Sequence, residues 1–206
     1  MGHSPARVTG AVLTGGRSRR MGRDKAQVIV AGRALVTVAA DALWGAGADP
    51  VLAVGGDGAV LGRLGLVPVP DAHPGAGPLG GLLSALAAAP GEVVVVLACD
   101  LPAVTAEGVR RVVDALDRAP EAAAAVPVAA GRRHALHAAW RRSSALPAVR
   151  AVLAAGERAL HGALDAMVTV PVGGLDPAWL ADVDTPADLA NLRLGRSGVQ
   201  GPDWGP

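Results

Sequence analysis

The amino-acid sequence predicts a single α/β domain with three layers, in which helices cover both faces of a Rossmann-like, mostly parallel sheet. Apolar runs alternate with segments whose apolar residues recur at helical spacing, which is typical of parallel strands joined by helices. The run Val93 to Leu97 is continuous rather than alternating, as expected of a central strand covered on both faces. A length of 206 residues suits one domain with its own core.

The domain is expected to span residues 7–194. Strands are predicted at residues 8–13, 51–54, 66–69, 92–98, 122–128 and 168–172, with a returning strand within 132–142. Helices are predicted at residues 35–45, 82–89, 105–116, 145–155, 158–164 and 186–194. The last of these has Thr185 as its N-cap and Pro186 at its first position. Residues 1–6 and 195–206 have no such pattern and are predicted to be flexible ends.

The first predicted strand leads into a glycine-rich, basic loop, and residues 13–25 read L-T-G-G-R-S-R-R-M-G-R-D-K. Glycine allows successive backbone N–H groups to approach one anion, and Arg20 and Lys25 can neutralise its charge. A triphosphate is the anion that this arrangement favours. Residues 13–25 match neither the G-x-x-x-x-G-K-[ST] nor the G-x-G-x-x-G motif. The alternative is an ordinary basic surface loop.

This loop resembles the signature of the nucleotidyltransferase family that includes the molybdenum cofactor guanylyltransferases, L-x-G-G-x-S-x-R-M-G-x-D-K, at every fixed position. The resemblance implies a fold of the nucleotide-diphospho-sugar transferase type. It also implies transfer of GMP from GTP to the phosphate of molybdopterin or Mo-molybdopterin, with Mg²⁺ as cofactor and pyrophosphate as product. Other proteins of molybdenum cofactor biosynthesis are implied as partners. The loop residues that it assigns to the nucleotide are Leu13, Thr14, Gly15, Gly16 and Lys25.

Asp100 follows the predicted central strand, at the edge where ligands of doubly wound sheets bind. A carboxylate there suits Mg²⁺, which proteins usually hold with one or two carboxylates plus substrate phosphates. The alternative role, capping the next helix, is better filled by Thr105. The sequence C-D-L-P at residues 99–102 also matches the family's C-D-x-P element. Asp100 is therefore expected to bind metal and nucleotide and to act in catalysis.

Residues 70–81 form a second loop rich in glycine and proline, which can lie against a flat ligand or serve as a plain connector. The family has a G-P-L-x-G element here, near the base, which implies a role for Gly77. Guanine presents N1–H and N2–H₂ donors, and a carboxylate can accept from both. Asp71, at the head of the loop, is predicted to bind this edge; alternatively it only initiates the turn before His73.

Asp182 and Asp184 project to the same side of an extended segment, where one of them can complete a metal site with Asp100. They match the family's D/N-x-D/N-T-P element, and Asn occurs there in some members, so either residue remains a candidate ligand. The family also places the segment around Arg133 and His134 towards the acceptor. A surface hairpin is the alternative for these two residues.

Composition excludes several classes of function. Nineteen basic and 18 acidic residues nearly balance, which argues against nucleic-acid or membrane binding. Phe and Tyr are absent, so the stacking surfaces of single-strand binders are missing. The single cysteine, Cys99, precludes an internal disulfide, and no apolar run reaches the ~18 residues of a membrane helix. A cytoplasmic location is expected.

Three other functions remain open. They are cytidylyl transfer to molybdopterin, nucleotidyl transfer to another small phosphorylated acceptor, and nucleotide-dependent regulation without turnover. The Thr14-Gly15-Gly16 form of the loop resembles guanylyl members, because cytidylyl members tend to carry Ala-Ala-Gly there. The presence of Arg20, Lys25 and Asp100 favours an enzyme over a regulator. Catalysis is expected to rest on positioning and charge neutralisation, without a protein nucleophile.

Overall fold

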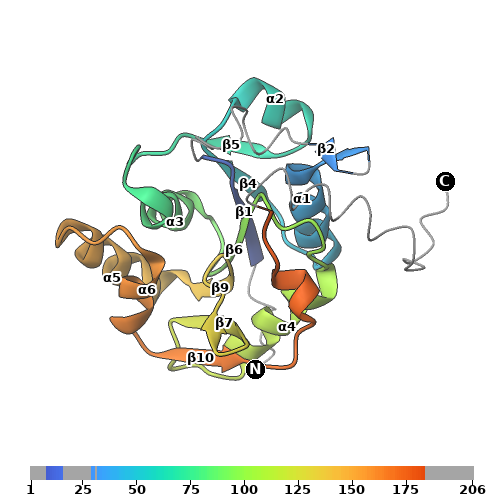
Figure 1. Ribbon diagram of the computed structural model, residues 1–206. Helices are drawn as coiled ribbons and strands as arrows, with labels where there is room; N and C mark the ends of the chain where they lie inside the picture. Colours follow the sequence, from blue (N-terminus) through green and yellow to red (C-terminus); the bar gives the residue numbers. More distant parts are fainter. Residues whose placement is uncertain (1–7, 16–28, 31, 184–206) are drawn as a thin grey trace, which may run out of the picture.

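The computed structural model describes residues 8–15, 29–30 and 32–183. One eight-stranded sheet has the strand order β10-β7-β9-β6-β1-β4-β5, and β8 pairs with β7 at its side (Figure 1). The strands are β1 (Val8–Leu13), β4 (Val51–Val54), β5 (Val67–Val69), β6 (Val93–Ala98), β7 (Ala124–Ala129), β8 (Arg132–Arg133), β9 (His137–Arg141) and β10 (Thr169–Val172). A separate two-stranded hairpin joins β2 (Ile29–Val30) and β3 (Arg33–Ala34).

Strand directions confirm the mostly parallel sheet, with one antiparallel strand at its centre. β5, β4, β1 and β6 are parallel to one another, and β10 is parallel to β7. β9 lies antiparallel between β6 and β7, so β6 has a parallel neighbour on one side only. Leu97 near the end of β6 therefore pairs with His137 at the start of β9. Because β9 is antiparallel to both β6 and β7, β7 and β10 run in the same direction as the other four parallel strands. The carboxyl ends of these six strands and the amino end of β9 therefore lie along one edge of the sheet.

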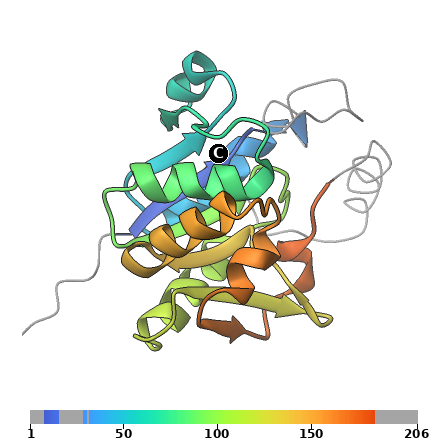
Figure 2. The ribbon, with the colours of Figure 1, turned by 90° about the vertical axis from the view of Figure 1, so that its left-hand side faces the viewer.

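Helices cover both faces of the sheet and produce the predicted three layers. Helices α1 (Leu35–Gly45) and α4 (Ala106–Asp117) lie on one face. Helices α3 (Gly77–Ala88), α5 (Arg142–Ala154) and α6 (Leu160–Asp165) lie on the other (Figures 1 and 2). The fully buried strand β6 contributes Val95 and Leu97 to the first core and Val94 and Val96 to the second. This double burial explains its unbroken apolar run.

Two short helices lie outside this pattern. Helix α2 (Gly58–Arg63), which was not among the predicted helices, begins after Asp57, whose side chain accepts hydrogen bonds from the N–H groups of Ala59 and Val60. The 3₁₀ helix η2 (Pro177–Leu180) is capped by Asp176. The predicted Thr105 cap of α4 is confirmed, because its hydroxyl accepts from the Gly108 N–H at 3.1 Å. Short polar caps thus set the starts of all three helices.

Helix α3 begins at Gly77 rather than at Leu82, so the G-P-L-G-G stretch is helical and not part of the preceding loop. Its glycines serve close packing. A Cβ on Gly80 would lie 2.9 Å from the carbonyl oxygen of His73, and one on Gly81 would lie 3.2 Å from the Leu13 side chain. The first turns of α3 therefore press against the end of β1.

The remaining differences concern boundaries. The returning strand predicted within residues 132–142 is two short strands, β8 and β9. Helix α5 begins at Arg142, before the predicted start at 145. The predicted helix 186–194 and the flexible ends 1–6 and 195–206 lie outside the described residues. No helix in the described ranges has the length and apolar character that a membrane crossing requires.

Candidate active site

Hydrogen bonds connect the loop after β1 to the end of β4 and the loop that follows it. The Thr14 hydroxyl is buried and lies 2.9 Å from the carbonyl oxygens of both Val54 and Gly55. The N–H groups of Thr14 and Gly15 both donate to the Val54 carbonyl at 3.0 Å. The Gly55 N–H in turn donates to the Val69 carbonyl at 2.9 Å, which connects β4 to the end of β5. Backbone bonds therefore fix the relative positions of three loops along this edge.

Gly55 and Gly15 are glycines for different reasons. Gly55 has φ +81°, and a Cβ there would lie 2.9 Å from the Gly15 Cα, so the fold itself requires glycine. Gly15 is exposed, and a Cβ on it would come no closer than 3.6 Å to any other part of the described chain. Packing within these residues does not explain Gly15. Its bare backbone instead leaves the exposed edge open to a ligand.

Asp71 initiates the turn after β5, as the alternative interpretation predicted. Its Oδ1 accepts from the His73 N–H at 2.9 Å and lies 3.3 Å from the Ser84 hydroxyl. The half-buried carboxylate is thus held through one oxygen. Its other oxygen makes no hydrogen bond to residues within the described ranges. The turn role and the predicted base contact are compatible, because they use different oxygens.

Gly77 lies where α3 meets the connection between α5 and α6. It has φ +68°, and a Cβ there would lie 3.2 Å from the carbonyl oxygen of Arg158. Both its conformation and this close approach favour glycine. The structure therefore gives Gly77 a packing role, and its predicted contact with the nucleotide stays a prediction.

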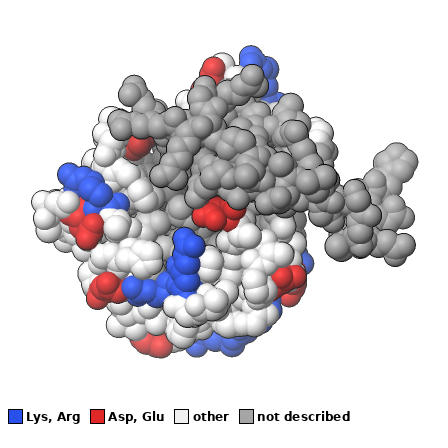
Figure 3. Space-filling view, viewed as in Figure 1, with Lys and Arg blue, Asp and Glu red and all other residues white. Residues whose placement is uncertain are grey.

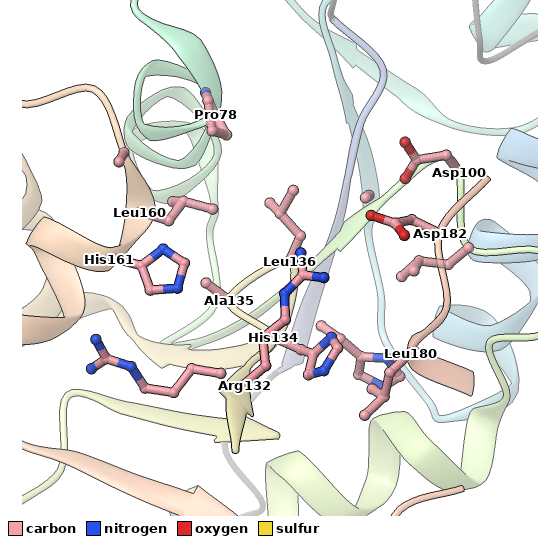
Figure 4. Close-up of a pocket in the computed structure, with 15 residues that line it drawn as sticks. Pro78, Asp100, Arg132, His134, Ala135, Leu136, Leu160, His161, Leu180 and Asp182 are labelled. Carbon is pink, nitrogen blue, oxygen red and sulfur yellow. The ribbon is translucent and has the colours of Figure 1, made fainter. Parts of the chain in front are cut away.

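Asp100 and Asp182 come together at the carboxyl end of β6. The N–H of Val183 donates to the backbone carbonyl of Asp100 at 3.0 Å, which docks the segment after η2 against this strand end. The two carboxylates lie close together on one side of a pocket (Figure 4). Two hard oxygen ligands suit Mg²⁺ bound together with substrate phosphates. Asp184, the other candidate, lies outside the described residues.

These carboxylates line a pocket of about 380 Å³. Its opposite wall comes from the start of α3 and from α6, through Pro78, Leu160 and His161 (Figure 4). Arg132 of β8 and His134 of the β8–β9 connection lie between the two walls. Sequence reasoning identified His134 but missed Arg132 and His161. A lone histidine in a short helix carries no spacing signal that would have revealed its position.

Arginine side chains supply the pocket's positive charge. Arg133 pairs with Asp165 of α6 at 2.6 Å, which ties β8 to that helix.

Burial and the nearby Arg132 lower the pKa of His134, and Asp182 opposes that shift. Burial lowers the pKa of His137 to about 4, so this ring is neutral at pH 7. On the face of the molecule that Figure 3 shows, acidic and basic side chains lie close together near the centre.

The basic side chains predicted to bind the triphosphate belong to a part of the first loop that the structure does not describe. Gly16, Arg20 and Lys25 lie outside the described residues, so their predicted roles stay predictions. Across the described ranges, no group of three or more His, Cys, Asp or Glu side chains could hold a metal ion. Among the described residues, the candidate metal site is the pair Asp100 and Asp182, and substrate phosphates usually complete Mg²⁺ sites of this kind.

The fold is a three-layer α/β domain whose carboxylate pair lies at the carboxyl ends of parallel strands, where such folds bind ligands. Residues 10–169 match the model of the MobA-like NTP transferase domain. A probable molybdenum cofactor guanylyltransferase of Mycobacterium marinum is 36% identical over 91% of this chain and 94% of its own length. A molybdenum cofactor guanylyltransferase of Cereibacter sphaeroides is 36% identical over 91% of this chain and 96% of its own length. The chain belongs to the MobA-like NTP transferase family, which confirms the resemblance of its first loop.

Solved structures agree on the fold. Molybdopterin-guanine dinucleotide biosynthesis protein A from Archaeoglobus fulgidus superimposes with a TM-score of 0.75 at 22% identity, over 93% of this chain and 100% of that one. The 2-C-methyl-D-erythritol 4-phosphate cytidylyltransferase from Thermus thermophilus superimposes with a TM-score of 0.68 at 21% identity, over 90% and 98%. At these identities the likeness concerns the fold, which guanylyl and cytidylyl enzymes share.

Proposed function

We propose that this chain is a molybdenum cofactor guanylyltransferase, which transfers GMP from GTP to the phosphate of molybdopterin or Mo-molybdopterin. The observation that carries this proposal is the meeting of Asp100 and Asp182 beside the pocket, at the same sheet edge as the exposed Gly15. The names of the full-length relatives support the choice of substrates. Other proteins of the cofactor's biosynthesis, and a cytoplasmic setting, belong to the same proposal.

In the proposed reaction, an oxygen of the acceptor phosphate attacks the α-phosphorus of GTP. The bond from that phosphorus to the oxygen bridging the β-phosphate breaks in line, and pyrophosphate leaves. The Gly15 N–H already donates to the Val54 carbonyl, so the backbone amide of Gly16 is the candidate for holding the triphosphate. Arg20 and Lys25 neutralise the charge of the departing pyrophosphate. Asp100 and Asp182 would hold Mg²⁺, which neutralises phosphate charge when bound. Each residue acts by positioning or charge.

The pocket supplies the acceptor side. Asp100 and Asp182 occupy one wall, so an acceptor phosphate placed there leaves the rest of the molecule to reach His161 and Arg132. Arg133 is already paired with Asp165, which makes Arg132 the better candidate for the acceptor. His134, with its lowered pKa, offers a neutral ring as a hydrogen-bonding partner.

Base choice tests the proposal. GTP should support far more pyrophosphate release than CTP when the protein is incubated with Mg²⁺ and molybdopterin, because a site built for guanine's donors leaves polar groups unpaired with cytosine. Asp71→Ala should lower the ratio of kcat/KM for GTP to that for CTP more than it lowers the unfolding temperature. Equal use of both nucleotides by the wild-type protein would favour cytidylyl transfer. Nucleotide binding without any release of pyrophosphate would favour a regulator.

A glycine pair separates binding from folding. Gly15→Ala should weaken GTP binding in titration calorimetry without changing the unfolding temperature, because its methyl would enter the exposed edge rather than the packed loops. Gly55→Ala should instead lower the unfolding temperature, because strain at φ +81° costs about 1–3 kcal/mol. Unchanged GTP affinity in Gly15→Ala would show that the nucleotide does not approach this backbone.

A further inference from the structure

Ser84 is a buried polar side chain that none of the roles above uses. It lies on α3 with 3% of its surface exposed. Its hydroxyl oxygen accepts from the Ala72 N–H at 3.1 Å and lies 3.0 Å from the Gly80 carbonyl and 3.3 Å from Asp71 Oδ1. The single hydroxyl hydrogen is thus shared between the helix and the Asp71 carboxylate. One side chain connects α3 to the loop that carries Asp71.

These contacts restrict the Asp71 carboxylate. Its Oδ1 accepts a hydrogen bond from the His73 N–H of the same loop and lies next to the Ser84 hydroxyl of α3. Two partners on the same oxygen limit rotation of the carboxylate plane. A carboxylate that is already oriented loses less rotamer entropy when it binds a pair of donors. Oδ2, with its two lone pairs, can then accept from two neighbouring donors on a ligand.

We propose that Ser84 is a positioning residue for base discrimination, acting through Asp71 on purines that carry both N1–H and a 2-amino group. This inference rests on the proposed function, in which Asp71 reads the guanine edge. Ser84 does not contact the base in this proposal. It fixes the orientation from which the carboxylate accepts both donors, and its loss should reduce selectivity for the 2-amino group.

Inosine triphosphate, which lacks only the 2-amino group of GTP, is the direct probe. Dissociation constants for GTP and ITP would be measured by calorimetry with Mg²⁺, and kcat/KM for both with molybdopterin. Wild type should prefer GTP, Asp71→Ala should lose most of this preference, and Ser84→Ala should reduce it about threefold to tenfold, the size expected for one hydrogen bond. Ala85→Gly, a buried change on the same helix, should lower the unfolding temperature without moving the ratio.

The outcomes separate this inference from the proposed function. A GTP-to-ITP ratio that is unchanged in Ser84→Ala but reduced in Asp71→Ala would overturn the role of Ser84 and leave guanylyl transfer intact. Equal binding of GTP and ITP by the wild type would also overturn it. Failure of GTP to support transfer, with the binding ratios as expected, would refute the proposed reaction while retaining Ser84 as a determinant of base selection.

Discussion

Asp100→Asn is expected to lower GMP transfer about a hundredfold to ten-thousandfold, while the unfolding temperature changes little. Asparagine keeps the shape of the side chain and removes the charge that would hold Mg²⁺. A bound metal ion contributes several kcal/mol to stabilising phosphoryl charge, at about 1.4 kcal/mol for each factor of ten in rate. Asp182→Asn should have a smaller effect, because the family tolerates asparagine at that position and the Asp182 side chain is exposed.

Calorimetry provides a readout that does not depend on turnover. GTP binding would be titrated with and without Mg²⁺ in wild type, Asp100→Asn and Asp182→Asn. Asp114→Asn, an exposed carboxylate change on α4, is the matched control and should behave as wild type. If Asp100→Asn bound GTP with the same dependence on Mg²⁺ as wild type, the metal would have to lie elsewhere.

Lys25→Ala and Arg20→Ala are each expected to lower turnover about tenfold to a hundredfold with the fold retained. Each charge-assisted contact to the β- and γ-phosphates contributes about 1.5–3 kcal/mol, and part of it grows as charge develops on the leaving pyrophosphate. The neighbouring Arg17, Arg19 and Arg23 are predicted to face solvent. Their alanine variants should therefore have much smaller effects and serve as controls of matched charge.

Separate measurements of kcat and of GTP affinity show whether each variant loses a contact in the transition state or in the bound state. A contact made mainly in the transition state lowers kcat, whereas one made equally in the bound state raises only KM. Thermal unfolding would confirm that each variant folds. Lys25→Ala with unchanged kcat and unchanged GTP affinity would refute the assignment of the first loop to the triphosphate.

The strands and layers were predictable because local physics determines them. The unbroken apolar run of β6 indicates a strand buried on both faces. The helical spacing of apolar residues in α1 indicates a helix buried on one face. Both inferences hold whatever the order of the strands in the sheet. The cap at Thr105 rests on a side chain bonding its own helix. Asp100 was predictable as a site residue because a parallel strand's carboxyl end is where such folds bind ligands.

Features that depend on distant partners were not predictable in this way. The antiparallel insertion of β9 depends on which strand edge is available, and no periodicity records that choice. The glycines of α3 suggested a loop, because their close packing against His73 and Leu13 appears only in three dimensions. Arg132 and His161 face the same pocket from segments that meet only after folding.

The hydrogen bond from Val183 to Asp100 affects the order in which parts of the chain fold during synthesis. It joins the last described segment to a strand near the middle of the sequence. Closing so long a loop costs entropy, and the sheet must already exist to receive it. A chain emerging from the ribosome can order its amino-terminal part before residue 182 is made. In the proposed enzyme, the carboxylate pair is therefore completed late in synthesis, after most of the sheet that supports it has been made.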